Sequence, residues 1–338
     1  MEKILLFIPI LVSFIVTVFL LPYWIRKMKE IGLVWDDMNK ISKNKVSGSG
    51  GVIAVLGFVV GVLFYVAYRI FYLKAYNSFL VEIFALLGSV LLLGWIGFID
   101  DLMGWRKGGL SKRSRIILVL IASIPLMAIN AGKSDVLIPF IGNYELGLIY
   151  PLILVPLGII GATTTFNFLA GFNGLEAGQG ILMLSALGFV AFFTGSAWLG
   201  IIALCMIAAL IGFLVFNFYP AKVFPGDTIT YPLGGLIAIM AILGNFEKIA
   251  LFFFIPYMIE TALKVRGRLI KYSFGEPHEN GNLSLRYNKI YSLNHLAILL
   301  MTKARIKPTE KKVVVCVWVF QIFVIILGIL IFSGGIFS

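Results

Sequence analysis

Residues 79–101, FLVEIFALLGSVLLLGWIGFIDD, decide the fold class of this 338-residue chain. Residues 79–99 contain one charged side chain, Glu82, and are long enough to cross the hydrocarbon core of a bilayer as a helix. The stretch ends in two adjacent aspartates, Asp100 and Asp101. It therefore predicts a membrane span with an acidic pair at one end.

Similar apolar stretches recur along the whole chain. The composition is 60% hydrophobic and 13% charged, with a mean hydropathy of +1.00, which is far too apolar for a soluble domain of this size. We expect an all-α, polytopic membrane protein with one membrane-embedded domain over residues 1–338. Its ten predicted spans lie at about residues 4–21, 51–71, 79–99, 116–130, 147–166, 180–194, 197–216, 229–243, 249–263 and 313–332. Gly57 and Gly61 have the spacing that lets two helices pack closely.

Basic residues are distributed unevenly between the two sets of connecting loops. The loops at about residues 22–50, 100–115, 167–179, 217–228 and 264–312 hold 23 of the 28 lysines and arginines. The remaining five are Lys3, Arg69, Lys74, Lys133 and Lys248. The positive-inside rule places the basic loops in the cytoplasm and both termini on the opposite side. The net charge of +12 thus indicates contact with anionic membrane lipid, not with nucleic acid.

The scarce acidic residues gather on the same predicted face. Asp100 and Asp101 follow the third span, Glu176 the fifth and Asp227 the seventh. Adjacent helical residues point about 100° apart, so one aspartate of the pair would face a metal or phosphate and the other a neighbouring cation. An alternative is that the pair is simply solvated at a helix end and that Asp227 caps the next helix.

A loop rich in glycine and asparagine, FNFLAGFNGLEAGQG, occupies residues 166–180. Glycines allow close backbone approach to a ligand, and asparagine offers both a donor and an acceptor to a uracil or a metal shell. These residues are also ordinary turn formers. Together with the acid pair and the NFYPAKVFPGDTITY segment around Asp227, however, the loop predicts an Mg²⁺-pyrophosphate site on one membrane face.

These clusters, in this order, resemble the polyprenyl-phosphate N-acetylhexosamine-1-phosphate transferase family, also called glycosyltransferase family 4. The stretches NGLEAGQG and FYPAKVFPGDT are most similar to the branch that makes dolichyl-diphosphate N-acetylglucosamine, in an archaeal-type form. The resemblance covers nearly the whole chain. It implies ten or eleven spans and a homodimer, which is common in the family.

The resemblance also implies roles for individual residues. Asp100, Asp101 and Lys112 match catalytic positions near the pyrophosphate and the acceptor phosphate, and Asn167 and Asp227 match the metal ligands. The implied substrate-binding residues are Asp37, Asn39, Lys40, Gly171, Asn173, Gly174, Glu176 and His278. Pro277 and Glu279 flank His278, where the eukaryotic branch has arginines.

The implied reaction joins a UDP-N-acetylhexosamine to a polyprenyl phosphate, such as dolichyl phosphate, with Mg²⁺ or Mn²⁺ as cofactor and UMP as the leaving group. N-acetylglucosamine 1-phosphate is the group that the resemblance favours. The rival interpretation is a secondary transporter or a permease for a lipid-linked intermediate. Transporters place ionisable residues near the bilayer midplane, whereas here only Glu82 and Glu260 lie within or near the edge of a span.

Overall fold

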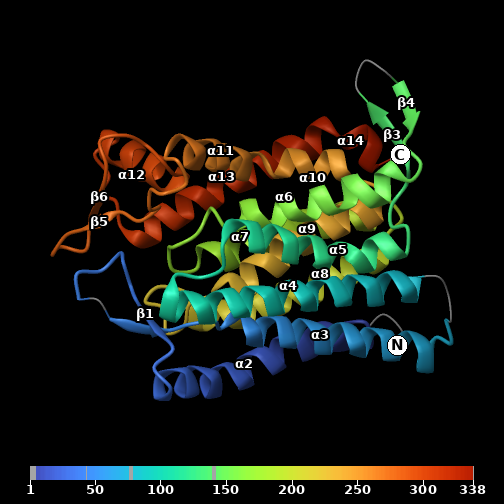
Figure 1. Ribbon diagram of the computed structural model, residues 1–338, viewed down its shortest axis with the longest axis horizontal. Helices are drawn as coiled ribbons and strands as arrows, with labels where there is room; N and C mark the ends of the chain where they lie inside the picture. The colour runs from blue at the N-terminus through green and yellow to red at the C-terminus, as the bar shows by residue number, and fades with distance from the viewer. Residues whose placement is uncertain (1–4, 43, 76–78, 139–141, 338) are drawn as a thin grey trace.

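The computed structural model describes residues 5–42, 44–75, 79–138 and 142–337. Residue 4, where the first predicted span begins, and residue 43 in the first basic loop lie outside the described residues. The described chain is mostly helical, which confirms the all-α class (Figure 1). Its α-helices are α2 Phe7–Glu30, α3 Gly51–Ala67, α4 Phe79–Lys107, α5 Lys112–Ala128, α6 Val155–Phe166, α7 Leu175–Phe193, α8 Ala197–Asn217, α9 Asp227–Gly244, α10 Glu247–Phe253, α11 Ile255–Arg266, α12 Leu293–Lys303, α13 Glu310–Ile331 and α14 Ser333–Ile336.

Two π-helical turns and three short hairpins complete the described fold. The turn η1 (Tyr68–Tyr72) extends α3, and the turn η2 (Tyr150–Leu154) directly precedes α6. Each hairpin is a two-stranded antiparallel pair. The pairs are β1 (Val34–Asp36) with β2 (Lys45–Ser47), β3 (Asp135–Ile138) with β4 (Gly142–Glu145), and β5 (Glu276–Pro277) with β6 (Leu283–Ser284).

Seven helices among the described residues are long and apolar enough to cross a membrane. They coincide with seven of the ten predicted spans, so the polytopic membrane class is confirmed. The other three predicted spans coincide with shorter helices: α5, the η2–α6 unit, and the α10–α11 pair, which is interrupted at Phe254.

Several helices continue past the predicted ends of the spans. α2 runs through Pro22 to Glu30, and α4 runs through Asp100 and Asp101 to Lys107. The predicted ends were wrong because hydropathy marks where the hydrocarbon stops, whereas helical hydrogen bonding can continue into the interface. As a result the acid pair is held on a rigid helix.

The long helices lie side by side, and the connections at their two ends differ (Figure 1). β1, β5, β6 and α12 lie at one end, whereas the start of α2, the end of α14 and the β3–β4 hairpin lie at the other. Glycines on α3 allow close packing against α2, as the sequence predicts: a Cβ at Gly57 would lie 2.8 Å from the Ser13 carbonyl oxygen, and one at Gly61 2.7 Å from that of Pro9.

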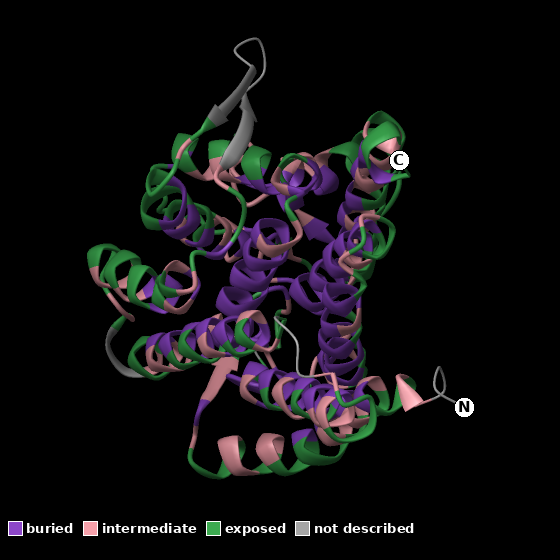
Figure 2. Ribbon diagram, turned by 90° about the vertical axis from the view of Figure 1, so that its right-hand side faces the viewer, coloured by how far each residue is buried: buried purple, intermediate pink, exposed green. Residues whose placement is uncertain are grey.

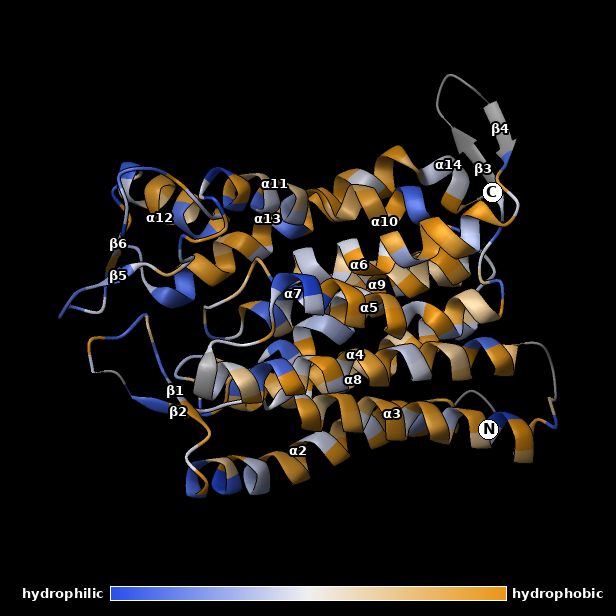
Figure 3. Ribbon diagram, viewed as in Figure 1, coloured by the Kyte–Doolittle hydropathy of each residue, from blue (hydrophilic) through white to orange (hydrophobic). Residues whose placement is uncertain are grey.

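Burial identifies the central helix of the bundle. Buried residues fill the interior and exposed ones the perimeter, as the view along the helices shows (Figure 2). The hydrocarbon-length part of α9 is 83% buried, against 22% for α2 at the edge. The exposed side chains on the outer helices are largely apolar, and hydrophilic residues gather in the loops around β1, β5 and β6 (Figure 3). α9, which begins with Asp227, therefore lies at the centre of the bundle.

Candidate active site

Asp100 is a buried carboxylate with one cationic partner. Its side chain is 2% exposed, and its oxygens lie 2.7 Å from Arg115 Nε and 3.0 Å from Arg115 Nη2. The Leu110 N–H and the Tyr231 hydroxyl also donate to it, at 2.8 and 2.9 Å. A two-pronged guanidinium contact of this kind holds a carboxylate firmly in one orientation. Of the adjacent aspartates, Asp100 is therefore the one that faces a cation.

The chain returns to Asp100 through a glycine turn. Gly108 and Gly109 have φ values of +90° and +80°, and a Cβ at Gly109 would lie 2.7 Å from Asp100 Oδ1. After this turn Ser111 caps α5 by accepting from Ser114 N–H at 3.1 Å. The cap starts the helix that carries Arg115 back to Asp100.

Lys112, the lysine that the resemblance places near the phosphates, is exposed at the first residue of α5. Arg115, one turn further along the helix, makes the contact with Asp100 instead. Arg115 was not predicted from the sequence, because Lys112 was matched to the lysine of the family before the start of α5 was known. The Gly-Gly pair followed by Ser111 was the signal that could have located that helix start.

Asp101 holds the beginning of α9. Its carboxylate accepts from Asp227 N–H at 2.8 Å, from Thr228 N–H at 3.4 Å and from the Thr228 hydroxyl at 2.6 Å. A side chain at Gly226, whose φ is +72°, would overlap this carboxylate. The first amides of a helix lack intrahelical acceptors and favour a negative charge, so Asp101 acts as a cap supplied by a neighbouring helix.

The same contact brings Asp227 beside the acid pair. A Cβ at Gly97 would collide with the Asp227 backbone, so glycine at this position lets α4 and α9 approach closely. The Asp227 carboxylate interacts electrostatically with those of Asp100 and Asp101 and with Arg115. One turn along α9, the Thr230 hydroxyl donates to Asn167 Oδ1 at 3.1 Å. The structure thus places all four predicted residues from three separate clusters around the start of α9.

This set of groups suits a hard divalent cation. Asp100 and Asp227 interact with the single guanidinium of Arg115, and Asp101 adds a third carboxylate beside Asp227, which leaves an excess of negative charge and several oxygen ligands. Among the described residues no group of three or more His, Cys, Asp or Glu side chains is arranged to hold a metal ion. Mg²⁺ does not need such a group, because it binds one or two carboxylates and completes its shell with water and substrate phosphates.

The Asn/Gly loop between α6 and α7 is fixed by contacts with other loops. Gly171, with a φ of +101°, donates its N–H to Glu176 Oε1 at 2.8 Å, and its carbonyl accepts from Asn39 Nδ2 at 2.8 Å. Asn173 Nδ2 donates to Asp37 Oδ2 at 3.1 Å, and its N–H donates to Glu310. Asp37 and Glu176 are both buried. These two predicted substrate-binding side chains therefore hold the loop in shape.

Gly174, another residue predicted to bind substrate, precedes α7 and has a φ of +86°. A glycine adopts this left-handed conformation without strain, which lets the Asn/Gly loop turn sharply into the helix. The structure thus gives Gly174 a conformational role at the end of this loop.

A second polar region lies beside this loop. A pocket of about 850 Å³ is lined by the loops that contain Asn39, Lys40, Tyr219 and His278, and by Lys311 in the first turn of α13. Lys40 Nζ lies 4.8 Å and Lys311 Nζ 5.1 Å from the centre of the Tyr219 ring. Glu279 and Glu310 also line it, and we call this region the basic pocket after its two lysines. Tyr219 and Lys311 were not singled out in the sequence, because the two residues are distant from each other along the chain.

The predicted residues in this pocket have contacts of their own. Lys40 Nζ lies 2.6 Å from Asp37 Oδ2, and His278 Nε2 lies 2.9 Å from the Ser284 hydroxyl across the β5–β6 hairpin. The metal and catalytic candidates at the start of α9 do not line the pocket. The predicted site residues therefore form two regions, an acidic one on helices and a basic one on loops, which the Asn/Gly loop connects.

Comparison with known proteins relates nearly the whole chain to glycosyltransferases. The family described as Glycosyl transferase family 4 matches residues 83–245, which contain the acidic region and the Asn/Gly loop. A Sulfolobus acidocaldarius protein named as a putative UDP-N-acetylglucosamine–dolichyl-phosphate N-acetylglucosaminephosphotransferase is 33% identical, over 95% of this chain and 94% of its own length. A Saccharolobus solfataricus protein with the same name is 34% identical over 96% of both chains. A Halalkalibacterium halodurans phospho-N-acetylmuramoyl-pentapeptide-transferase is 32% identical over 80% of this chain and 86% of its own.

Proposed function

This chain belongs to glycosyltransferase family 4, and we propose that it transfers N-acetylglucosamine 1-phosphate from UDP-N-acetylglucosamine to a polyprenyl phosphate such as dolichyl phosphate. The observation that carries the proposal is the meeting of Asp100, Asp101, Asp227 and Asn167 around the start of α9. The two relatives that match nearly the whole chain are both named for this reaction. The relatives described above are all named as transferases, which does not favour a transporter or a permease.

The proposed reaction is a displacement at phosphorus. An oxygen of the polyprenyl phosphate attacks the β-phosphorus of the UDP-sugar, and the bond from that phosphorus to the bridging oxygen breaks, so that UMP leaves with the electron pair. The acceptor phosphate is largely ionised at neutral pH, because its second pKa is about 6, and a general base is therefore not essential. Catalysis then rests on positioning and charge.

The residues at the start of α9 divide this work. Asp227 and Asn167 would hold Mg²⁺, or Mn²⁺, through oxygen atoms, and the bound ion would offset the negative charge of the diphosphate. Asp101 fixes the position of Asp227 through the α9 cap. Asp100 orients Arg115 through the two contacts with its guanidinium, at 2.7 and 3.0 Å. The guanidinium would draw the two anionic substrates together.

The surface of α6 offers a place for the lipid tail. Leu154, Leu157, Gly158 and Gly161 lie along one exposed face, and a Cβ at either glycine would meet no atom within 4 Å. The helix ends at Phe166, just before Asn167. A polyprenyl chain lying along this apolar face would carry its phosphate toward the acidic region. The concentration of basic residues in the adjoining loops supports a cytoplasmic position for that region.

The test uses the purified chain in detergent with Mg²⁺, UDP-N-acetylglucosamine and dolichyl phosphate. UMP release and a chloroform-soluble sugar product should appear together, and both should disappear with EDTA and return with Mg²⁺ or Mn²⁺. The surface variant Glu30→Gln is the control for preparation of the protein, since the Glu30 side chain is exposed and pairs with Lys27 of the same helix. A folded protein that gives neither product with any UDP-N-acetylhexosamine would refute the transferase proposal.

A further inference from the structure

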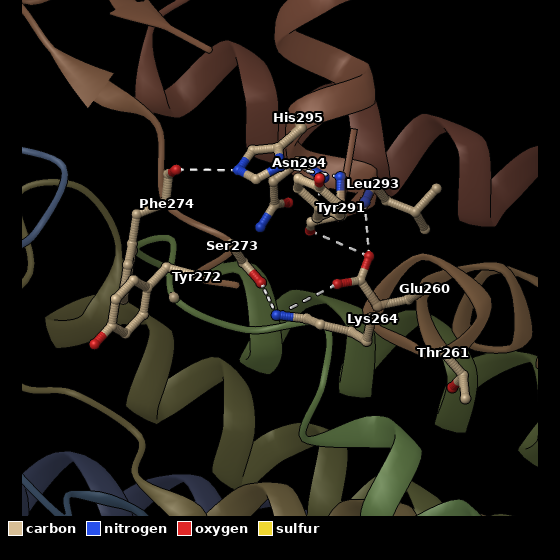
Figure 4. A network of polar contacts seen from close by, with 12 residues as sticks. Glu260, Thr261, Lys264, Tyr272, Ser273, Phe274, Tyr291, Leu293, Asn294 and His295 are labelled. Atoms are coloured by element: carbon tan, nitrogen blue, oxygen red, sulfur yellow. Dashed lines mark hydrogen bonds and ion pairs between the residues drawn. The ribbon is translucent and has the colours of Figure 1, made fainter. Parts of the chain in front are cut away.

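Three consecutive residues of the last long loop, Ser273, Phe274 and Gly275, are each held by a different part of the protein. The Ser273 hydroxyl accepts from Lys264 Nζ, and the Phe274 carbonyl accepts from His295 Nε2 at 3.1 Å (Figure 4). The Gly275 N–H donates to Asn39 Oδ1 at 3.3 Å. We call these three residues the strap.

The strap bears on the Asn/Gly loop. A Cβ at Gly171 would lie 2.6 Å from Phe274 Cε1, so the phenyl ring lies directly against that glycine. Asn39, which accepts from the strap through Oδ1, donates through Nδ2 to the Gly171 carbonyl at 2.8 Å. The strap and Asn39 together therefore fix the backbone of Gly171 from two sides.

A buried carboxylate supports the strap from the opposite side. Glu260 of α11 is fully buried, and its Oε2 accepts from Leu293 N–H at 2.6 Å and from the Ser292 hydroxyl at 3.1 Å. It thereby caps α12, the helix whose first turn carries His295. Its other oxygen lies 3.9 Å from Lys264 Nζ (Figure 4). One carboxylate thus locates two of the three groups that hold the strap, Lys264 and His295.

His295 is suited to this contact in its neutral form. It is 1% exposed, and its Nδ1 accepts from Tyr291 N–H at 3.3 Å, so that the ring proton lies on Nε2 and is donated to Phe274. Burial lowers the pKa of His295. Burial also lowers the pKa of Lys264, although the charge of Glu260 opposes that change.

We propose that Glu260, Lys264 and His295 are positioning residues for the UDP-sugar: they fix the strap, and the strap fixes the Gly171 backbone. The inference rests on the proposed function and on the sequence-based prediction that the Asn/Gly loop contacts the uracil of the UDP-sugar. None of the three side chains needs to touch substrate. A buried ion pair contributes little net stability compared with apolar side chains of similar size, so its main effect here is to orient Ser273 and α12. A loop held in its binding conformation gains affinity because less conformational entropy is lost on binding.

The kinetic test separates the two substrates. Lys264→Met removes the donor to Ser273 while keeping side-chain length, and we expect the KM for UDP-N-acetylglucosamine to rise about tenfold, the effect of losing one charged hydrogen bond. The KM for dolichyl phosphate and kcat should stay within about twofold, and Lys264→Arg should restore most of the affinity. Lys303→Met, an exposed lysine at the end of α12, is the matched control. Equal increases in both KM values, or a fall in kcat alone, would overturn the assignment.

A second variant covers the case in which Lys264→Met fails to fold. Ser273→Ala leaves the Glu260–Lys264 pair in place and removes only its contact with the strap. The KM for the UDP-sugar should rise about threefold, in line with the loss of a single hydrogen bond. An unchanged KM in this folded variant would also refute the role of the strap.

Hydrogen exchange tests the role of the strap without an activity assay. Backbone amides in residues 167–175 should exchange faster in Lys264→Met and Ser273→Ala than in the wild-type chain, and at the wild-type rate in Lys303→Met. Unchanged exchange in both strap variants would refute the inference even if the enzyme is active. Faster exchange in the strap variants, combined with no transfer by the wild-type chain, would refute the proposed function but support the conclusion that the strap holds the Asn/Gly loop.

Discussion

The acidic region and the basic pocket are built in opposite ways. The acidic region lies on α4, α5 and α9, and its carboxylates are held by buried contacts such as those of Asp100 and Asp101. The basic pocket is lined mainly by loops, together with the first turn of α13, where Lys311 is exposed. The matched family segment, residues 83–245, contains the first region entirely but not Lys40, His278 or Lys311 of the pocket. The difference leads us to expect that the helical region contributes mainly to catalysis, whereas the pocket contributes mainly to binding of the UDP-sugar.

The acidic region should show the largest effect of any single substitution. Asp227→Asn keeps the shape of the side chain and the N–H bond to Asp101, but removes one negative charge from the proposed metal site. We expect kcat to fall at least about 1000-fold, because charge stabilisation is the main source of catalysis here. UMP release and the melting temperature are the measurements. Retention of more than a tenth of the activity would mean that Asp227 does not bind the metal.

Arg115 tests how the acid pair is organised. Arg115→Met leaves Asp100 buried without its cation, so we expect activity to fall about 100-fold and the free energy of unfolding to fall by about 2 kcal/mol, given the partial exposure of Arg115. Arg115→Lys removes the two-pronged contact with Asp100, and we expect its activity to be about tenfold lower than that of the wild-type chain. Arg113→Met, on the exposed side of α5, is the matched control.

Lys112→Met decides between the two basic residues on α5. The resemblance favours Lys112 as the phosphate-contacting group, whereas the geometry favours Arg115. If Lys112→Met proves more damaging to kcat than Arg115→Met, the assignment from the structure is wrong.

The basic pocket should respond more weakly and in a different parameter. Lys311→Met removes one of the two lysines beside Tyr219, and we expect the KM for UDP-N-acetylglucosamine to rise about fivefold with little change in kcat. The effect should shrink in high salt because Lys311 is exposed. A loss of kcat, or a rise in KM for the lipid substrate instead, would abolish the distinction between the two regions.

The sequence predicted the helices better than their ends. A bilayer demands long apolar segments, so spans are readable from hydropathy, and every predicted span coincides with helical structure. The ends depend on contacts with other helices, such as the Asp101 cap on α9, which hydropathy does not contain. Glu260, one of two acids that seemed to suit a transporter, caps α12 instead.

The candidate residues were likewise easier to find than their partners. Scarce acids in an apolar chain stand out, so Asp100, Asp101 and Asp227 were visible from the sequence alone. Arg115 and Tyr219 reach the site through a glycine turn and through the approach of distant loops. Only the folded chain determines those contacts.

The smallest expected effect concerns pH and separates the strap from the acidic region. The pKa of His295 is lowered from its ordinary value of 6.5, so the unfolded chain takes up the proton first as the pH falls. The neutral ring therefore makes its full contribution to the free energy of unfolding above about pH 6.5. That contribution declines as the pH falls from there toward the pKa of His295 in the folded chain. Lys264 and Arg286, both cationic, disfavour protonation further.

We expect the melting temperature to drop by roughly 3 °C more between pH 7.5 and 5.5 in the wild-type chain than in His295→Gln, which cannot be protonated. Over the same range the KM for the UDP-sugar should rise before kcat changes, because protonation removes the acceptor on Nδ1 and loosens the α12 start that supports the strap. Parallel pH profiles of wild type and His295→Gln would show that the ring is not the titrating group. An earlier change in kcat would instead place the sensitive group in the acidic region.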